Sequence, residues 1–230
     1  MKGVSLKPRH LAVLLLALLC GCVHLERSYP DKHYFVLEVG GIGQPANQPG
    51  KGILEVSEVR VSPRYADPNF VYRLSETSYE SDFYNQFLIA PAALATEEIR
   101  KALARSGVFE YVISPSDQLP STFRLQGIIN ALYGDFRNSH GASAVVEIEF
   151  FLTRQASNPN EIAIAKRYSK SVPLTARSPE ALVKGWDEAL GAVLTSFIAD
   201  LKSANLQPSN CCPTGPAGPD IDKSGGEETR

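Results

Sequence analysis

Every second residue from position 144 to position 152 is apolar. The apolar positions of one parity are Ala144, Val146, Ile148, Phe150 and Leu152. Glu147 and Glu149 fall on the other parity, which is the pattern of an antiparallel strand with one face in the core. We therefore interpret both glutamates as solvent-facing strand residues, rather than as a pair of catalytic carboxylates.

Runs rich in aromatic and β-branched residues predict further strands along the chain. The runs are 34–39, 53–61, 70–74, 79–83, 109–113, 122–136 and 162–172. The last of them is more polar and carries several basic residues, which is typical of a strand at a sheet edge. The polar stretches between the runs contain proline, glycine, serine or asparagine, as expected for turns.

Two of these runs have an informative parity. Between Val56 and Val59 the apolar positions slip by one residue, which a β-bulge or burial on both faces would explain. In the run 122–136, the apolar residues keep a single parity through Ala131 and Tyr133. We therefore expect this strand to bury one face along its whole length.

Two segments have helical periodicity, and both carry end signals. The first begins near Pro91, where proline is tolerated in the first turn, and ends at Ser106–Gly107 with glycine as a left-handed cap. The second begins at Ser178–Pro179, with serine as the N-cap, and runs to Ser203. Its apolar stripe comprises Leu182, Trp186, Leu190, Val193, Phe197 and Leu201. Because Trp186 lies within this stripe, we interpret it as a core residue rather than a binding platform.

The order of the predicted elements is strands, one helix, four more strands and a long helix. Runs of antiparallel strands with segregated helices indicate the α+β class. We expect a single two-layer sandwich, with a mainly antiparallel mixed sheet and two helices on one face. The predicted domain covers residues 34–204, which is a usual length for one domain.

The beginning of the chain reads as an export signal. Three basic residues precede an apolar run from Leu11 to Leu19, and small residues follow. The run is much shorter than the ~20 apolar residues that span a membrane. Leu19-Cys20-Gly21-Cys22 resembles a bacterial lipobox, so we expect removal of residues 1–21 and lipidation of Cys22. An ordinary cleaved signal and an uncleaved anchor are the alternatives.

Polar segments flank the predicted domain. Residues 22–33 lack periodicity and are interpreted as a tether between the lipid and the domain. Residues 205–230 are rich in proline, glycine, serine and charge, so we expect a disordered tail. The tail contains Cys211 and Cys212, for which a vicinal disulfide, an intermolecular bridge and a dispensable pair all remain open.

Charge and motifs exclude several function classes. The chain has a net charge of −2, which becomes −5 once residues 1–21, with three basic and no acidic residues, are removed. This balance argues against nucleic-acid binding, which needs a concentrated basic face.

No nucleophile elbow, zinc-protease motif or phosphate-binding loop is present. His24 and His33 are better explained by a solvated tether than by a metal site. We expect a non-enzymatic protein without catalytic residues, metal or cofactor; a lipoprotein hydrolase is a weaker alternative.

One turn and the strand after it carry candidate partner-binding residues. Tyr65, Asp67, Tyr72 and Arg73 follow Pro63 within a short stretch. Aromatic residues and arginine are enriched at protein interfaces. A partner surface and a structural turn with an aromatic residue and an arginine covering a sheet edge explain the pattern equally well.

Several of these segments, taken in order, resemble the ABC-transport auxiliary lipoprotein family, which includes the outer-membrane lipoprotein of paraquat-inducible MCE transport systems. The resemblance covers about residues 22–203. Behind the lipobox, it rests on Tyr34-Phe35-Val36-Leu37, Leu54-x-Val56-x-x-Val59-x-Val61-x-Pro63-x-Tyr65-Ala66-Asp67, Val71-Tyr72-Arg73, Tyr84-x-x-Phe87-Leu88-x-x-Pro91, Ser106-Gly107-Val108-Phe109 and Asp135-Phe136. Phe87 departs from the tryptophan that the family commonly has in the segment before the first helix.

The resemblance implies an accessory role in lipid transport between membranes. Its expected partners are an MCE-domain protein with its ABC permease and ATPase, and the outer membrane, reached through the lipid anchor from the periplasm. Val23 resembles an outer-membrane sorting signal, because lipoproteins kept at the inner membrane commonly carry aspartate there. A homo-oligomeric ring and a lipid bound by the domain itself are further expectations. The alternative is an envelope-assembly scaffold that binds another outer-membrane protein.

Overall fold

The computed structural model describes residues 31–42, 50, 52–138, 141–155, 161–204 and 206. By its internal contacts the chain divides into the units Met1–Asp31 and Lys32–Arg230, and every element below belongs to the second unit. The predictions for the signal peptide, Cys22, most of the tether, Cys211 and Cys212 concern residues outside these described ranges.

The second unit contains nine strands, two α-helices and two short 3-10 helices among its described residues. The strands are β1 (His33–Phe35), β2 (Ile53–Val56), β3 (Arg60–Val61), β4 (Asn69–Arg73), β5 (Tyr79–Phe87), β6 (Tyr111–Ile113), β7 (Phe123–Asp135), β8 (Ser143–Arg154) and β9 (Glu161–Pro173). The helices are η1 (Pro63–Tyr65), α2 (Pro91–Ser106), η2 (Pro115–Asp117) and α3 (Pro179–Ser203). Each predicted strand and helix is present, with ends shifted by a few residues.

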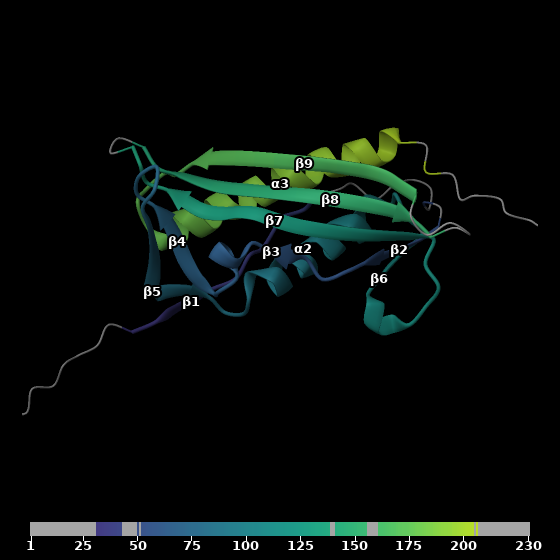
Figure 1. Ribbon diagram of the computed structural model, residues 1–230, viewed down its shortest axis with the longest axis horizontal. Coiled ribbons are helices and arrows are strands. Elements are labelled where there is room, and N and C mark those ends of the chain that lie inside the picture. The colour runs from purple at the N-terminus through teal and green to yellow at the C-terminus, as the bar shows by residue number, and fades with distance from the viewer. Residues whose placement is uncertain are drawn as a thin grey trace, which may run out of the picture. The chain divides into compact units, whose positions relative to one another are not determined.

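Strand β7 organises the sheet (Figure 1). Along one side it pairs antiparallel with β8, which pairs antiparallel with β9 at the edge. Along its other side it pairs in parallel with three short strands in succession, β2, β3 and β4. β2 also pairs with β6. β4 pairs with β5, which in turn pairs with β1. This side of the sheet therefore branches into two lobes.

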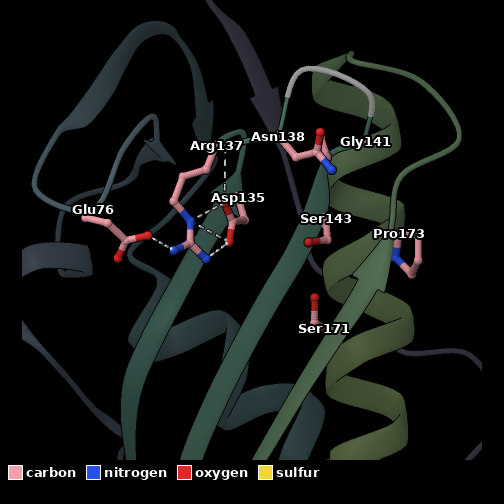
Figure 2. A pocket seen from close by; sticks show the side chains of 9 residues that line it. Glu76, Asp135, Arg137, Asn138, Gly141, Ser143, Ser171 and Pro173 are labelled. Carbon is pink, nitrogen blue, oxygen red and sulfur yellow. Dashed lines mark hydrogen bonds and ion pairs between the residues drawn. The ribbon is translucent and has the colours of Figure 1, made fainter.

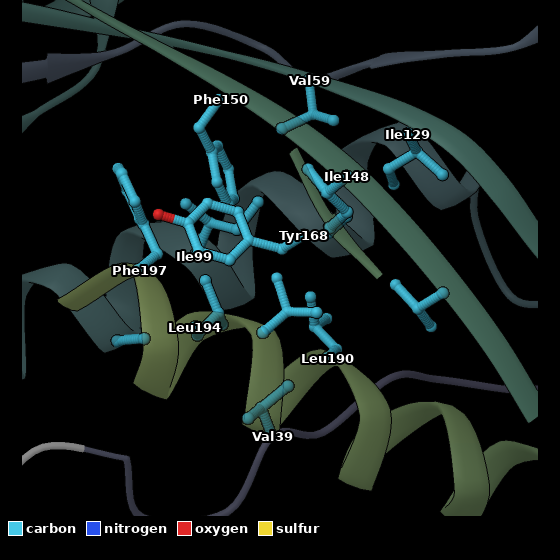
Figure 3. Close-up of a cluster of buried hydrophobic side chains, with 14 of the residues drawn as sticks. Val39, Val59, Ile99, Ile129, Ile148, Phe150, Tyr168, Leu190, Leu194 and Phe197 are labelled. Atoms are coloured by element: carbon cyan, nitrogen blue, oxygen red, sulfur yellow. The ribbon is translucent and has the colours of Figure 1, made fainter. Parts of the chain in front are cut away.

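The fold class is confirmed: the molecule is α+β, with an open mixed sheet and α2 and α3 behind it in Figure 1. The longest ladders are antiparallel, and the parallel ones span only two or three residue pairs each. The core lies between the sheet and the helices (Figure 3), where the Phe197 ring stacks on Phe150 with 4.3 Å between centroids. Trp186 is fully buried and meets Phe70 edge-on at 5.0 Å, which confirms its interpretation as a core residue.

The helix ends follow the predicted chemistry. Ser178 Oγ accepts the Ala181 N–H at 3.2 Å, which satisfies a backbone donor that the first turn of α3 leaves without a partner. Gly107 ends α2 at φ 65°, a left-handed conformation that favours glycine.

The segment after β1 is tied to both helices by backbone amides. Glu38 N–H donates to Asp187 Oδ1 of α3 at 2.9 Å, and Val39 N–H donates to Glu98 Oε2 of α2 at 2.9 Å. Val39 is buried and packs against α3 at Gly191.

The slip between Val56 and Val59 is a bulge, as one of the two explanations predicted. The four steps from Val56 to Arg60 lie opposite three steps of β7, from Leu125 to Ile128. One extra residue therefore separates β2 from β3.

The prediction of one parity along residues 122–136 is wrong. Ile129 pairs with Ile148 of β8 and Ala131 pairs with Glu147, so Asn130 is an extra residue in β7. A one-residue bulge moves every later side chain to the opposite face. Leu132 therefore points to the core, whereas Ala131 and Tyr133 point to the face away from the helices.

Candidate partner-binding surface

The bulge at Asn130 brings Tyr133 into a group of aromatic side chains on the open face of the sheet. The Tyr133 ring lies 6.0 Å from Tyr65 in a stacked arrangement and 6.0 Å from Tyr79 edge-on. The Arg73 guanidinium lies 5.7 Å from the Tyr79 ring centroid and 6.0 Å from that of Tyr133. We call these four residues the arginine–tyrosine cluster.

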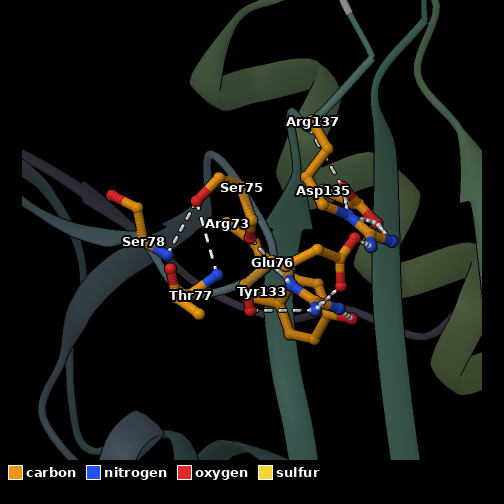
Figure 4. Close-up of polar contacts among 8 residues, drawn as sticks. All are labelled: Arg73, Ser75, Glu76, Thr77, Ser78, Tyr133, Asp135 and Arg137. Carbon is orange, nitrogen blue, oxygen red and sulfur yellow. Dashed lines mark hydrogen bonds and ion pairs between the residues drawn. The ribbon is translucent and has the colours of Figure 1, made fainter.

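Arg73 also closes the turn between β4 and β5 (Figure 4). Its Nε donates to the Ser75 carbonyl at 3.2 Å, and its Nη2 donates to Glu76 Oε2 at 2.9 Å. Ser75 Oγ accepts the backbone N–H groups of Thr77 and Ser78. Arg73 is therefore a structural residue of this hairpin as well as a cation beside two rings.

Charged residues of both signs continue the surface beyond the cluster. Arg137 Nη2 lies 2.7 Å from Asp135 Oδ2, and Arg137 also pairs with Glu76. The hydrogen bonds from Arg137 lower the pKa of Asp135 below its usual value. Because Arg137 is paired with two carboxylates, it is not a free cation that could hold a phosphate.

A polar hollow of about 680 Å³ lies beside these ion pairs (Figure 2). Glu76, Asp135 and Arg137 line one wall. The start of β8 and the end of β9 contribute Ser143, Ser171 and Pro173. Hydroxyl groups and paired charges give such a surface donors and acceptors for a polar protein partner.

The sequence-predicted residue Tyr65 lies in η1 and is buried. Burial, with the neighbouring Tyr79 and Tyr133, raises its pKa to about 12, so the hydroxyl stays neutral. Asp67 is exposed and lines a second hollow, of about 330 Å³, with Arg64 and Tyr79. Tyr65 is therefore the buried member of the cluster, whereas Asp67 lies at its border.

The structure separates Tyr72 from Arg73. Successive side chains of β4 point to opposite faces, and Tyr72 packs edge-on against Phe136 at 5.2 Å. Its hydroxyl donates to Asp82 Oδ2 at 2.7 Å. Burial and this carboxylate raise the pKa of Tyr72. The four predicted interface residues therefore do not form one surface.

Asp82 is a residue that the sequence pattern did not single out. Its carboxylate accepts the Tyr84 N–H at 2.8 Å, the Asn85 N–H at 3.0 Å, and the Tyr72 hydroxyl. Burial pushes its pKa upward, but the hydrogen bonds from Asn85 and Tyr72 leave it below the usual value. Tyr79 and Tyr133 were also missed, because Asn130 stands at a position that the alternation already makes polar and so gives no sign of the bulge.

Among the described residues, no group of three or more histidine, cysteine, aspartate or glutamate side chains is arranged to hold a metal ion. In the same part of the chain, no helix is long and apolar enough to cross a membrane. Phe87, where the resembled family commonly has tryptophan, packs 5.3 Å from Trp186 in the core.

Neither a family model nor a curated protein matches the sequence. Solved structures match the fold. A crystal structure of a DUF330-family protein from Xanthomonas campestris is 14% identical over 72% of this chain and 92% of its own, with a TM-score of 0.62. A second, described as an uncharacterized protein, is 16% identical over 75% of this chain and 99% of its own, with a TM-score of 0.59. This chain therefore has the fold of a DUF330 protein.

Proposed function

We propose that this protein is a lipid-anchored, non-enzymatic accessory subunit of an MCE/ABC-type system that moves lipids between membranes. Cys22 carries the anchor, and the domain faces the periplasm from the outer membrane. The lipobox-like sequence and the ordered resemblance motivate the class. The DUF330 fold agrees with a family of this kind, and the surface around the arginine–tyrosine cluster suits the docking of an MCE-domain protein.

The observation that carries the docking surface is the position of Tyr79. It is the exposed member of the cluster and borders the hollow of Asp67. Exposed tyrosines beside arginine and polar walls are typical of interface hot spots. Tyr72 and Arg73 are poorer probes, because both stabilise the hairpin itself.

The proposal is tested by photo-crosslinking in intact envelopes. A photoreactive amino acid replaces Tyr79 or Ser143, and Tyr111 on the distant lobe serves as the exposed control. We expect crosslinks to an MCE-domain subunit from the first two positions and not from the control. Crosslinks to a β-barrel or assembly protein would favour the scaffold alternative. Equal labelling from all three positions would show that the surface around Tyr79 and Ser143 is not the docking site.

Tyr79→Ala provides a quantitative check. Loss of an interface tyrosine costs on the order of 2 kcal/mol, so we expect recovery of the complex to fall roughly tenfold or more. Tyr111→Ala, which removes a similarly exposed ring, should leave recovery unchanged. Native mass measurement of the same samples tests whether copies of the chain assemble into a ring.

A further inference from the structure

Six large exposed apolar side chains gather along the β1–β5 ladder and the residues that directly follow it. We call them the β1–β5 patch: Tyr34, Val36, Phe83, Tyr84, Leu88 and Ile89. Phe83 is 61% exposed and Leu88 is 59% exposed, both high fractions for residues of this type. Contiguous exposed apolar surface usually marks an interaction site.

The ladder turns three members of the patch, Tyr34, Val36 and Leu88, to a common side. In β1, Phe35 packs inward on Phe70 with 5.2 Å between ring centroids. Because side chains alternate, Tyr34 and Val36 point the other way. In β5, Phe87 is buried and Leu88 is exposed. Leu88 N–H donates to the Phe35 carbonyl at 2.8 Å, which places Leu88 beside the end of β1.

An irregular segment of β5 exposes the rings of Phe83 and Tyr84 at the other end of the patch. The register between β4 and β5 shifts from Val71↔Ser81 to Asn69↔Gln86, so β5 contains extra residues at this point. Asp82 accepts three hydrogen bonds from Tyr84 and Asn85 within this irregular part of β5 and a fourth from the Tyr72 hydroxyl. The rings of Phe83 and Tyr84 then lie edge to face, 5.3 Å apart.

We infer that the β1–β5 patch contacts the surface of the bilayer that holds the lipid anchor. This inference rests on the anchor of the proposed function. Lys32, the first residue of the folded unit, is ten residues after Cys22. Ten extended residues span at most ~36 Å, so this end of the domain stays within that distance of the membrane.

The chemistry of the patch fits a lipid surface. Lys32 Nζ lies 4.2 Å from the Phe83 ring centroid, which places a cation where anionic headgroups would be. Tyrosine favours the headgroup level, whereas phenylalanine and leucine on an interfacial surface are buried ~5–10 Å into the boundary between headgroups and acyl chains. The exposed Tyr111, Leu119 and Ile162 lie on or beside other strands and serve as controls.

The test uses the lipidated chain in vesicles of phosphatidylethanolamine and phosphatidylglycerol, with no other protein. Cys211 and Cys212 are replaced by serine, and an environment-sensitive fluorophore is attached through Leu88→Cys, Phe83→Cys or, as the control, Tyr111→Cys. We expect blue-shifted emission and at least about twofold stronger quenching by spin-labelled lipids at positions 88 and 83 than at 111, as shallow burial at the interface requires.

Two outcomes overturn the inference: equal quenching at all three positions, or a shift at position 88 only after envelope proteins are added, which would make the patch a protein-binding surface. The mass of each preparation reports lipidation at Cys22 separately. If no lipid is present, the anchor of the proposed function fails. The patch is then tested in the same chain, bound through an N-terminal histidine tag to nickel-chelating lipids.

Discussion

The Asp82 carboxylate lies in the loop of β5 that exposes Phe83 and Tyr84. It holds the Phe83–Tyr84 loop by accepting hydrogen bonds from two backbone amides, one side-chain amide and one hydroxyl. Removing a partly buried acceptor leaves its donors without partners, at about 1–3 kcal/mol.

Asp82→Ala should therefore lower the free energy of unfolding by ~1–3 kcal/mol, measured by urea denaturation. Tyr72→Phe removes only one of the donors, so we expect about 1 kcal/mol or less. Hydrogen exchange at the Tyr84 and Asn85 amides should accelerate in the alanine variant. Unchanged exchange at both amides would show that the loop does not depend on the carboxylate.

Asp187 makes stability depend on pH in a direction unusual for a carboxylate. Burial raises its pKa to about 7, with Glu38, Glu98 and Glu188 adding repulsion. The Glu38 N–H opposes this by donating to it. Because the folded pKa exceeds the unfolded value, the folded state binds more protons between pH ~4 and ~7. Stability from this group is present below pH ~4 and is lost as pH rises through about 7.

Thermal unfolding from pH 4 to 8 checks this linkage. Relative to Asp187→Asn, whose amide does not titrate, the wild-type protein should lose stability as pH increases across this interval. A constant difference between the two proteins at every pH would contradict the raised pKa.

At the scale of elements, α3 depends on its N-cap. Ser178→Ala removes the acceptor for the Ala181 N–H and should cost ~1 kcal/mol of folding free energy. Ser196→Ala, a substitution of an exposed serine within the same helix, is the matched control and should be neutral or slightly stabilising, because alanine is the better helix former. Equal melting temperatures for the two variants would mean that the cap contributes nothing measurable.

Periodicity and end signals were enough to predict both helices and most of the strands, because most elements bury one face and end in recognisable turn chemistry. The single strand expected over residues 53–61 is two strands, β2 and β3. The sheet connections were harder. The parallel pairings of β7 with β2, β3 and β4 join short segments far apart in sequence, and no local pattern encodes them. The bulge at Asn130 changes the facing of Tyr133 only through its partner strand, so the arginine–tyrosine cluster could not be assembled from the sequence.

For the whole molecule, the proposed lipid anchor would decide where both proposed surfaces can act. Cys22→Ser should release the protein from the outer-membrane fraction and abolish its support of transport, which fractionation and a lipid-transfer assay measure. The control is Cys211→Ser with Cys212→Ser, which leaves the lipobox intact. Continued fractionation of the Cys22→Ser protein with the outer membrane would contradict the anchor.

The way the chain enters the domain also has a mechanical consequence. If a pull on the chain before Lys32 is directed along β1, which pairs in parallel with β5, it would load the hydrogen bonds of that ladder together in shear. After β1 in the sequence, the backbone N–H groups of Glu38 and Val39 donate to carboxylates on two different helices. A force applied through a membrane tether would thus be distributed over the sheet and both helices, which would oppose unfolding of the domain from β1.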